Sequence, residues 1–208
     1  MTRRLAELVV GALIAPLTLA LAPLATAPVW AAPADPAAAR VEAFDDALIG
    51  AMKAGAAAGP RGRGRTLAPA VESGFDLPTM TRFAVGPAWA SMSEAQHGAL
   101  VGAFTRFTVA SYASNFDSYG GQKFMVQAVQ TRGADKIVPV QLVSPHGAPV
   151  TLIYRLHETP SGWKIIDIYF NGISQLTTRR ADFAQPLNMG GASGLISHLD
   201  ALTQKLDG

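Results

Sequence analysis

The chain has 208 residues, with 17 Lys and Arg against 15 Asp and Glu, and it contains no cysteine. This near-neutral balance excludes the basic field that holds a nucleic-acid backbone. The lack of cysteine excludes disulfides, thiolate catalysis and cysteine-based metal sites, so the fold must be stabilised by packing.

Residues 1–32 have the features of a cleavable export signal. Two arginines precede a hydrophobic run at 8–24, and small residues follow it, which is the order found in secretory signals. An uncleaved membrane anchor is the alternative, but Pro16 and Pro23 interrupt a run that is already marginal for the about 20 residues of a membrane-spanning helix. No cysteine follows the run, which excludes a lipid anchor on cysteine. We expect an exported protein whose mature part, residues 33–208, is a single domain.

The first half of the mature chain predicts helices. Residues 37–57 place apolar side chains at spacings of three and four, which forms one stripe on a helix. The Gly- and Arg-rich run at 59–65 has no phosphate-loop spacing, so we interpret it as a solvated turn that breaks this helix. A short helix at 67–71 follows, and then a helix that begins after the N-cap Asp76 and ends at Gly86.

The next predicted helix is the longest. Trp89 is expected to be a buried anchor just before it, and Ser93 with Gln96 forms a capping box that opens it. The helix should run to about residue 117 with a broad apolar face rich in aromatic residues. Such a face is typical of a core, and it is also the kind of surface that lines a cavity.

After residue 121 the apolar period changes from 3.6 to 2, which predicts strands at 123–131, 136–144, 150–158 and 162–170. The turns between them are short, so neighbouring strands should be antiparallel and form a four-stranded meander. Strict alternation in the last strand puts Trp163, Ile165, Asp167 and Tyr169 on one face and Lys164, Ile166, Ile168 and Phe170 on the other.

Both faces of that strand carry apolar side chains, and a sheet that is apolar on both faces needs a second cover or a ligand. Helices are predicted at 173–183 and from about 188 to the end of the chain. The expected fold class is therefore α+β, with N-terminal helices, the meander and C-terminal helices, and with an apolar cavity between the helices and a curved sheet.

Few residues suggest catalysis or metal binding. The four histidines are distant in sequence from one another and from other ligand types, so we predict no metal site and place His97, His146 and His198 on the surface. The adjacent Asp45-Asp46 pair is a poor acid–base pair, because neighbouring helix residues do not face each other. No motif for a cofactor or for a catalytic residue is present.

Asp167 is the exception, because a carboxylate in the middle of an apolar strand must be paired or solvated. Two interpretations remain open. It is a general base or a head-group contact, or it belongs to a salt bridge with Arg155, Arg179 or Arg180.

Several segments occur in an order and spacing found in one protein family. These segments are 76–89, 93–96 with the helix that follows, 162–168, 172–174, and Arg180 three residues before Phe183. Together they resemble the MlaC-type periplasmic phospholipid carriers, also called toluene-tolerance proteins. Residues 177–183 depart from the more usual Asn/Tyr-rich form and resemble the hopanoid-associated branch.

The resemblance implies a periplasmic shuttle, without enzyme activity or cofactor, between the inner and outer membranes of a Gram-negative cell. Its implied partners are an MCE-domain protein of an inner-membrane ABC transporter and an outer-membrane lipoprotein complex that maintain lipid asymmetry. The implied cargo is a phospholipid whose tails enter the protein, or a hopanoid-type lipid. We exclude nucleic acid as a partner on charge.

The cavity is expected to be lined by the aromatic helix faces and the apolar strand positions. The predicted lining residues are Phe83, Trp89, Phe104, Phe107, Tyr112, Leu152, Tyr154, Ile166, Ile168 and Phe170. Two alternatives stay open from the residues alone. One is a small-molecule enzyme on a cone-shaped α+β fold with Asp167 as base in an apolar cavity, and the other is a ligand-free envelope module with a solid core.

Overall fold

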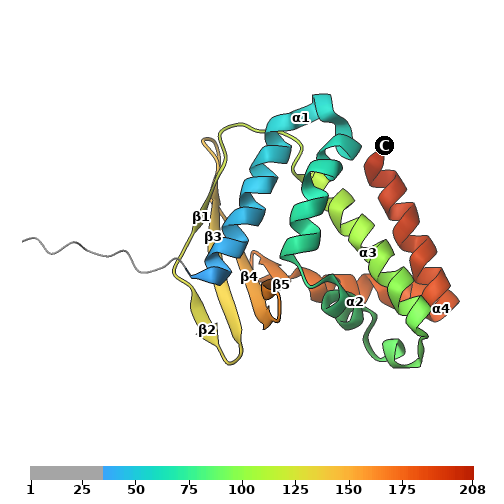
Figure 1. Cartoon of the computed structure of the whole chain (residues 1–208). Helices are drawn as coiled ribbons and strands as arrows, with labels where there is room; N and C mark the ends of the chain where they lie inside the picture. The colour runs from blue at the N-terminus through green and yellow to red at the C-terminus, as the bar shows by residue number, and fades with distance from the viewer. Residues whose placement is uncertain (1–34) are drawn as a thin grey trace, which may run out of the picture. The chain divides into compact units, whose positions relative to one another are not determined.

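In a computed structural model of the protein, the described residues are 35–208, and the predicted export signal lies outside them. These residues form four helices and a 3₁₀ helix around six strands, which confirms the α+β class (Figure 1). The helices are α1 (Pro36–Gly74), α2 (Leu77–Val85), η1 (Gly86–Ser91), α3 (Glu94–Asn115) and α4 (Gln175–Asp207). The strands are β1 (Lys123–Val126), β2 (Gln130–Arg132), β3 (Asp135–Val143), β4 (Val150–Thr159), β5 (Gly162–Phe170) and β6 (Ile173–Ser174).

The strands form one antiparallel sheet in the order β1-β3-β4-β5-β6, and β2 also pairs with β3. The meander is confirmed, but the prediction of four strands is wrong. The first predicted strand is divided into β1 and β2, and β6 adds a short strand after the Asn-Gly turn. Pro139 of β3 explains the division, because its carbonyl accepts from Gln127 N (2.8 Å) on this edge while its ring nitrogen has no hydrogen to donate there.

Helix α1 bends sharply at Gly55 (φ 60°) and Gly59 (φ 63°), so its two halves run side by side in opposite directions (Figure 1). The break was predicted, but the solvated turn at 59–65 was wrong. Pro60 begins the second half, since proline suits the first position of a helix. The segment predicted at 67–71 is the end of this second half.

Arg63, in the segment predicted to be solvated, is only 4% exposed. Its Nε donates to the carbonyl of Ala113 (2.8 Å) and its Nη1 to that of Gly55 (2.9 Å). The guanidinium therefore satisfies carbonyls at the C-terminal end of α3 and at the kink of α1, where the helix dipole favours a cation.

The predicted helix starts are confirmed by their hydrogen bonds. Asp76 accepts from Thr79 N (3.0 Å) at the start of α2, and Ser93 and Gln96 form both bonds of the capping box at the start of α3. The residues predicted as two C-terminal helices form one element, α4, which bends at Gly191 (φ 57°).

Two predictions between α2 and α3 were wrong. Trp89 is only partly buried, because η1 lies on the outside and contains no buried residue. Its ring stacks on His97 at 3.9 Å, and a ring nitrogen of His97 lies 2.9 Å from the carbonyl oxygen of Trp89. His97 is thus partly buried, as is His198, whereas His146 is exposed as predicted.

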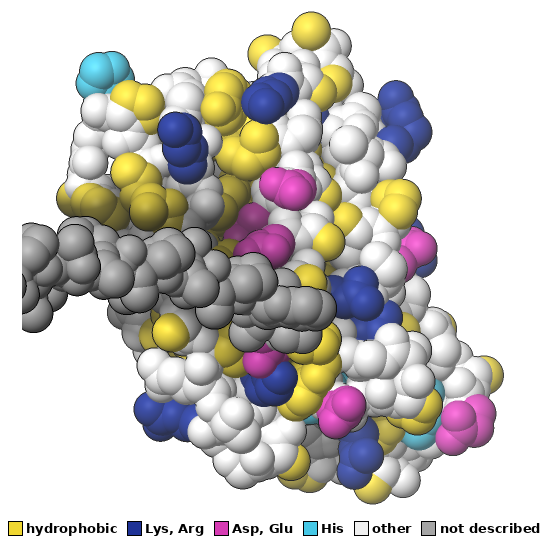
Figure 2. All heavy atoms as spheres, turned by 60° about the vertical axis from the view of Figure 1, so that its left-hand side comes forward, with side chains coloured by type: hydrophobic (Ala, Val, Ile, Leu, Met, Phe, Trp, Pro, Cys, Tyr) yellow, Lys and Arg dark blue, Asp and Glu magenta, His cyan; other side chains and the backbone are white. Residues whose placement is uncertain are grey.

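The hydrophobic core lies between the helices and the inner face of β3, β4 and β5. Charged side chains of both signs are mixed with hydrophobic ones on the face shown in Figure 2, with no field of one sign. Within residues 35–208 no helix is long and apolar enough to cross a bilayer, and no group of three or more His, Asp and Glu side chains is placed to hold a metal ion.

Candidate functional site

A cavity of about 530 Å³ lies within the core, lined by α3 on one side, by β4 and β5 on another, and by the first turns of α4. Leu48 of α1, Met80 of α2 and Leu142 of β3 complete its apolar wall. The cavity is accessible to solvent, because Phe170, one of its lining residues, is 46% exposed and Asn115 is exposed as well. Seven helices and strands therefore enclose a hollow that their own side chains do not fill.

Seven of the ten residues predicted to line a cavity are brought together there. They are Phe104, Phe107 and Tyr112 of α3, Leu152 and Tyr154 of β4, and Ile168 and Phe170 of β5. The three α3 residues share one helix face by their spacing, and the strand residues share the inner face of the sheet.

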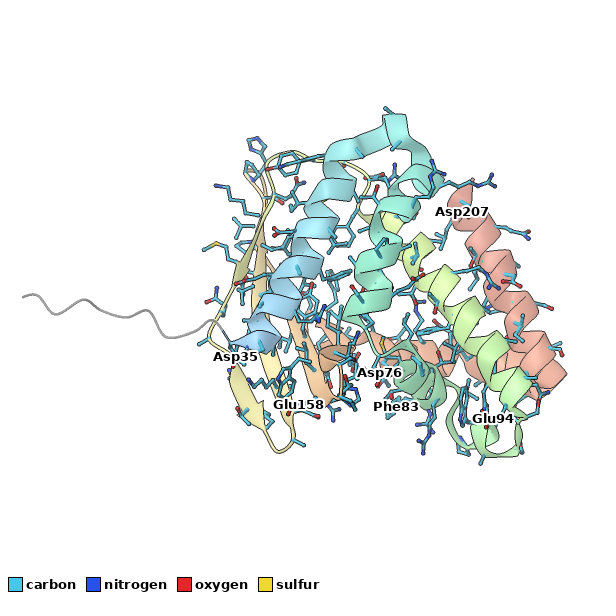
Figure 3. The ribbon with its side chains drawn as sticks, viewed as in Figure 1. Asp35, Asp76, Phe83, Glu94, Glu158 and Asp207 are labelled. Carbon is cyan, nitrogen blue, oxygen red and sulfur yellow. The ribbon has the colours of Figure 1, made fainter. Side chains whose placement is uncertain are left out.

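The other three predicted residues lie outside the cavity wall. Phe83 is 49% exposed on α2 (Figure 3), and Trp89 stacks on His97 instead. Ile166 is displaced by an irregularity in β5, described next.

The displacement of Ile166 follows from the pairing of β4 with β5. Arg155 is opposite Asp167, but the next residue of β4, Leu156, is opposite Ile165, so Ile166 has no partner and forms a β-bulge. A bulge adds one residue and reverses the alternation beyond it. Ile165 and Ile168 consequently lie on the same, buried face of the sheet. Strict alternation had predicted that they lie on opposite faces.

Asp167 is 6% exposed and lines the cavity, and its carboxylate is held by hydrogen bonds rather than by the predicted salt bridge. One oxygen accepts from the backbone N–H groups of Ile168 (2.8 Å) and Leu176 (3.1 Å). The other accepts from the hydroxyl of Ser174 (2.6 Å), the N-cap residue of α4. Its carboxylate thus holds the start of α4 against β5, near the favourable positive end of the helix dipole.

The predicted salt bridge of Asp167 is wrong, because the three candidate arginines interact with other residues. Arg155 pairs with Asp135 at 2.6 Å, Arg179 contacts Asp182 at 3.4 Å, and Arg180 lies 5.7 Å from the ring centre of Phe83.

Sequence reasoning missed a second buried carboxyl group, Asp45, which is 3% exposed on α1. One of its oxygens accepts from the hydroxyl of Tyr154 (2.7 Å), a cavity-lining residue, and the other has no hydrogen-bond partner among residues 35–208. Burial raises the pKa of Asp45 to about 7, while the Tyr154 hydrogen bond acts in the opposite direction. A signal was present, since Asp45 lies four residues after Val41 and three before Leu48 on the predicted apolar stripe.

The polar part of the cavity wall was also missed. It consists of side chains on α3 and on the start of α4, at helical spacings of three and four: Thr108, Ser111 and Asn115, and Gln175 and Arg179. Arg179 lies 4.9 Å from the ring centre of Phe107, which also lines the cavity. These spacings place each set on one helix face, but only the tertiary structure shows that the two faces meet.

An apolar cavity with a polar side near solvent is the geometry of a binding protein for amphipathic molecules. The comparison with known proteins agrees and is more specific. The family model described as MlaC protein matches residues 42–201, so the chain belongs to the MlaC family. This is a periplasmic family of lipid-binding carriers and not of enzymes.

A solved structure with the same fold is the phospholipid-binding protein from Ralstonia solanacearum in complex with a phospholipid. The TM-score is 0.69 and the sequence identity is 24%, and the match covers 82% of this chain and 98% of the other. At this identity the likeness is evidence for the fold.

Proposed function

We propose that the mature protein, residues 33–208 after removal of the export signal, carries a phospholipid through the periplasm with its acyl tails in the cavity. The observation that carries this proposal is the hollow of about 530 Å³, whose lining is mostly aromatic and aliphatic, with polar side chains contributed mainly by α3 and the start of α4. Family membership and the phospholipid bound to the Ralstonia solanacearum protein support the same cargo.

A lipid carrier needs an apolar cavity, because acyl tails held in water cost a large free energy. Burying one methylene is worth about 0.8 kcal/mol, so two tails with about 30 methylenes would cost on the order of 20 kcal/mol to hold in water. A carrier must replace water with apolar side chains along the tails, and the volume observed here is within the usual range for ligand sites.

The wider role that fits this cargo is exchange of lipid between the inner and outer membranes. The partners would be the MCE-domain protein of an inner-membrane ABC transporter and an outer-membrane lipoprotein complex. A hopanoid-type lipid is the second candidate cargo, favoured by the sequence of residues 177–183.

Lipid extraction and mass spectrometry on protein purified from the periplasm test the proposal. The wild type should contain phospholipid in about equimolar amount. Ile168→Glu, which puts a charge in the cavity wall, should contain none, whereas the matched control Ile166→Glu, on the bulge outside the cavity, should retain lipid.

Ser111→Trp provides a second variant without a buried charge, since it fills the cavity from α3. It should also lose lipid while its circular dichroism spectrum stays that of the wild type. Wild-type protein that contains no lipid and takes none up would reject the proposal, as would a folded Ser111→Trp with full lipid content.

A further inference from the structure

We infer that Arg179 binds the phosphate of the cargo's head group, so that the cavity selects phosphate-bearing lipids over uncharged lipids with the same tails. This inference rests on the proposed function and makes it more specific. It separates a phospholipid from a hopanoid-type lipid that carries no phosphate.

Arg179 occupies the polar part of the cavity wall. It is the single basic side chain among the described residues that line the cavity, and it stands on the second turn of α4, one turn after Gln175. Apart from Asp167 and the Tyr154 hydroxyl on the sheet, the polar side chains of the lining lie on α3 and the start of α4. A head group would come to lie beside them, with the tails against the apolar lining residues. A phosphodiester at that place would be within the field of the guanidinium.

The guanidinium of Arg179 is available to a ligand. The ion pair of Arg179 with Asp182 is 3.4 Å long, whereas the other Arg and Lys ion pairs of residues 35–208 measure 2.6 to 2.7 Å. Charge-assisted hydrogen bonds are normally about 2.7 to 2.9 Å. The guanidinium therefore makes only a weak contact with its one carboxylate neighbour, on a partly exposed helix turn.

Arg179 is already positioned beside the cavity by an aromatic contact. The guanidinium lies over the ring of Phe107 with a distance of 4.9 Å to the ring centre. A guanidinium can hold an aromatic contact of this kind and still offer N–H groups to two oxygens of a phosphate. A cation already held beside the cavity loses little conformational entropy when a ligand binds.

Neighbouring polar side chains can join Arg179 in binding the phosphate. Ser111, Tyr112, Asn115 and Gln175 line the same cavity and can donate hydrogen bonds to phosphate oxygens. Burial raises the pKa of the Tyr112 hydroxyl, and the charge of Arg179 opposes that shift. Tyr112 thus remains protonated at neutral pH.

Asp167 is the one acidic side chain among the described residues of the cavity wall, and it does not compete for Arg179. Its two oxygens accept three hydrogen bonds from β5, Ser174 and the start of α4, and it forms no ion pair with Arg179 among the described residues. The cavity wall thus contains a carboxylate whose oxygens already accept hydrogen bonds and a guanidinium that can bind a ligand.

The test offers purified, delipidated protein an equimolar mixture of phosphatidylglycerol and diacylglycerol with identical tails, in a phosphate-free nonionic detergent. Native mass spectrometry gives the ratio of the two bound lipids. The wild type should prefer phosphatidylglycerol, and Arg179→Gln should lower that ratio about tenfold, which is the effect expected of one charge-assisted contact. Arg180→Gln is the matched control, because Arg180 is the adjacent exposed arginine and does not line the cavity.

The possible outcomes are distinct. Unchanged preference in Arg179→Gln, or equal binding of both lipids by the wild type, overturns the phosphate site and leaves the carrier function intact. Binding of neither lipid by the wild type rejects the proposed function itself. Arg179→Lys gives a second variant that keeps the charge without the planar fork, and its ratio should lie between those of the wild type and Arg179→Gln.

Discussion

Arg63 at the kink of α1 and Arg179 beside the cavity show two uses of the same side chain. Arg63 is 4% exposed and donates to two backbone carbonyls, whereas Arg179 has one long contact to a carboxylate. A guanidinium whose donors are saturated by the backbone stabilises the fold. A guanidinium held against an aromatic ring with free donors is available to a ligand.

The two buried carboxyl groups, Asp167 and Asp45, also differ in how many hydrogen bonds they make. Asp167 accepts three hydrogen bonds near the start of α4. Asp45 accepts one, from a tyrosine, and its second oxygen has no partner in the described part of the chain. The number of donors that reach a buried carboxyl group decides whether its charge is tolerated. Four predictions test this contrast.

The largest expected effect is the pH dependence caused by Asp45. Its folded-state pKa of about 7 is above the value of 3.8 for an unperturbed Asp, so the folded state binds the proton more tightly than the unfolded state does. The stability contributed by that proton is present below about pH 4 and is lost as pH rises through about 7, on the order of 4 kcal/mol in all. Urea unfolding of wild type and Asp45→Asn should show the wild type losing stability relative to the variant over this range.

The comparison of wild type with Asp45→Asn isolates Asp45, because every other titrating group is common to both proteins. The lowered pKa values of Asp35 and Asp76 act in the opposite direction and only below about pH 4. A stability difference between wild type and Asp45→Asn that stays constant with pH would contradict the assignment.

Asp167→Ala should have the next largest effect on stability. The free energy of unfolding should fall by about 3 kcal/mol, because the substitution leaves two buried N–H groups without an acceptor. Asp182→Ala, an exposed carboxylate on the same helix, should change stability by less than about 0.5 kcal/mol. Chemical denaturation measures both. Equal effects of the two substitutions would mean that the hydrogen bonds of Asp167 do not hold α4.

Arg63→Ala should lower the free energy of unfolding by about 2 to 3 kcal/mol, since two carbonyls at a helix end and a kink lose a charged donor. Arg61→Ala, two residues earlier and exposed, should be close to neutral. Thermal unfolding followed by circular dichroism compares them. If Arg63→Ala were as stable as Arg61→Ala, the buried guanidinium would not be a structural element.

The smallest effect is expected for Ser174→Ala, at about 1 kcal/mol, the usual cost of removing an N-cap hydroxyl. This substitution removes the bond to Thr177 N (3.0 Å) and one of the three donors to Asp167. In a double-mutant cycle with Asp167→Ala the two changes should be non-additive. Additive losses would show that Ser174 acts on α4 independently of Asp167.

Helix starts, most strand limits and the aromatic face of α3 could be predicted, because each depends on neighbours within a few residues. The caps at Asp76 and Ser93 are local hydrogen bonds, and the spacing of Phe104, Phe107 and Tyr112 alone places them on one face. The positions of Ile166 and of the Arg-rich start of the second half of α1 could not be predicted. A bulge depends on the pairing partner, and the burial of Arg63 depends on a carbonyl 50 residues away.

By itself the sequence determined the class of fold, the order of its elements and most of the apolar residues that face the interior, since burial of apolar surface follows from periodicity. Only the tertiary structure decided that these residues enclose a hollow, that Arg179 stands beside it and that Asp45 is buried with one donor. The physical reason is that a filled core and an open cavity use the same residue types. What distinguishes them is the distance between elements far apart in the chain, which no local pattern encodes.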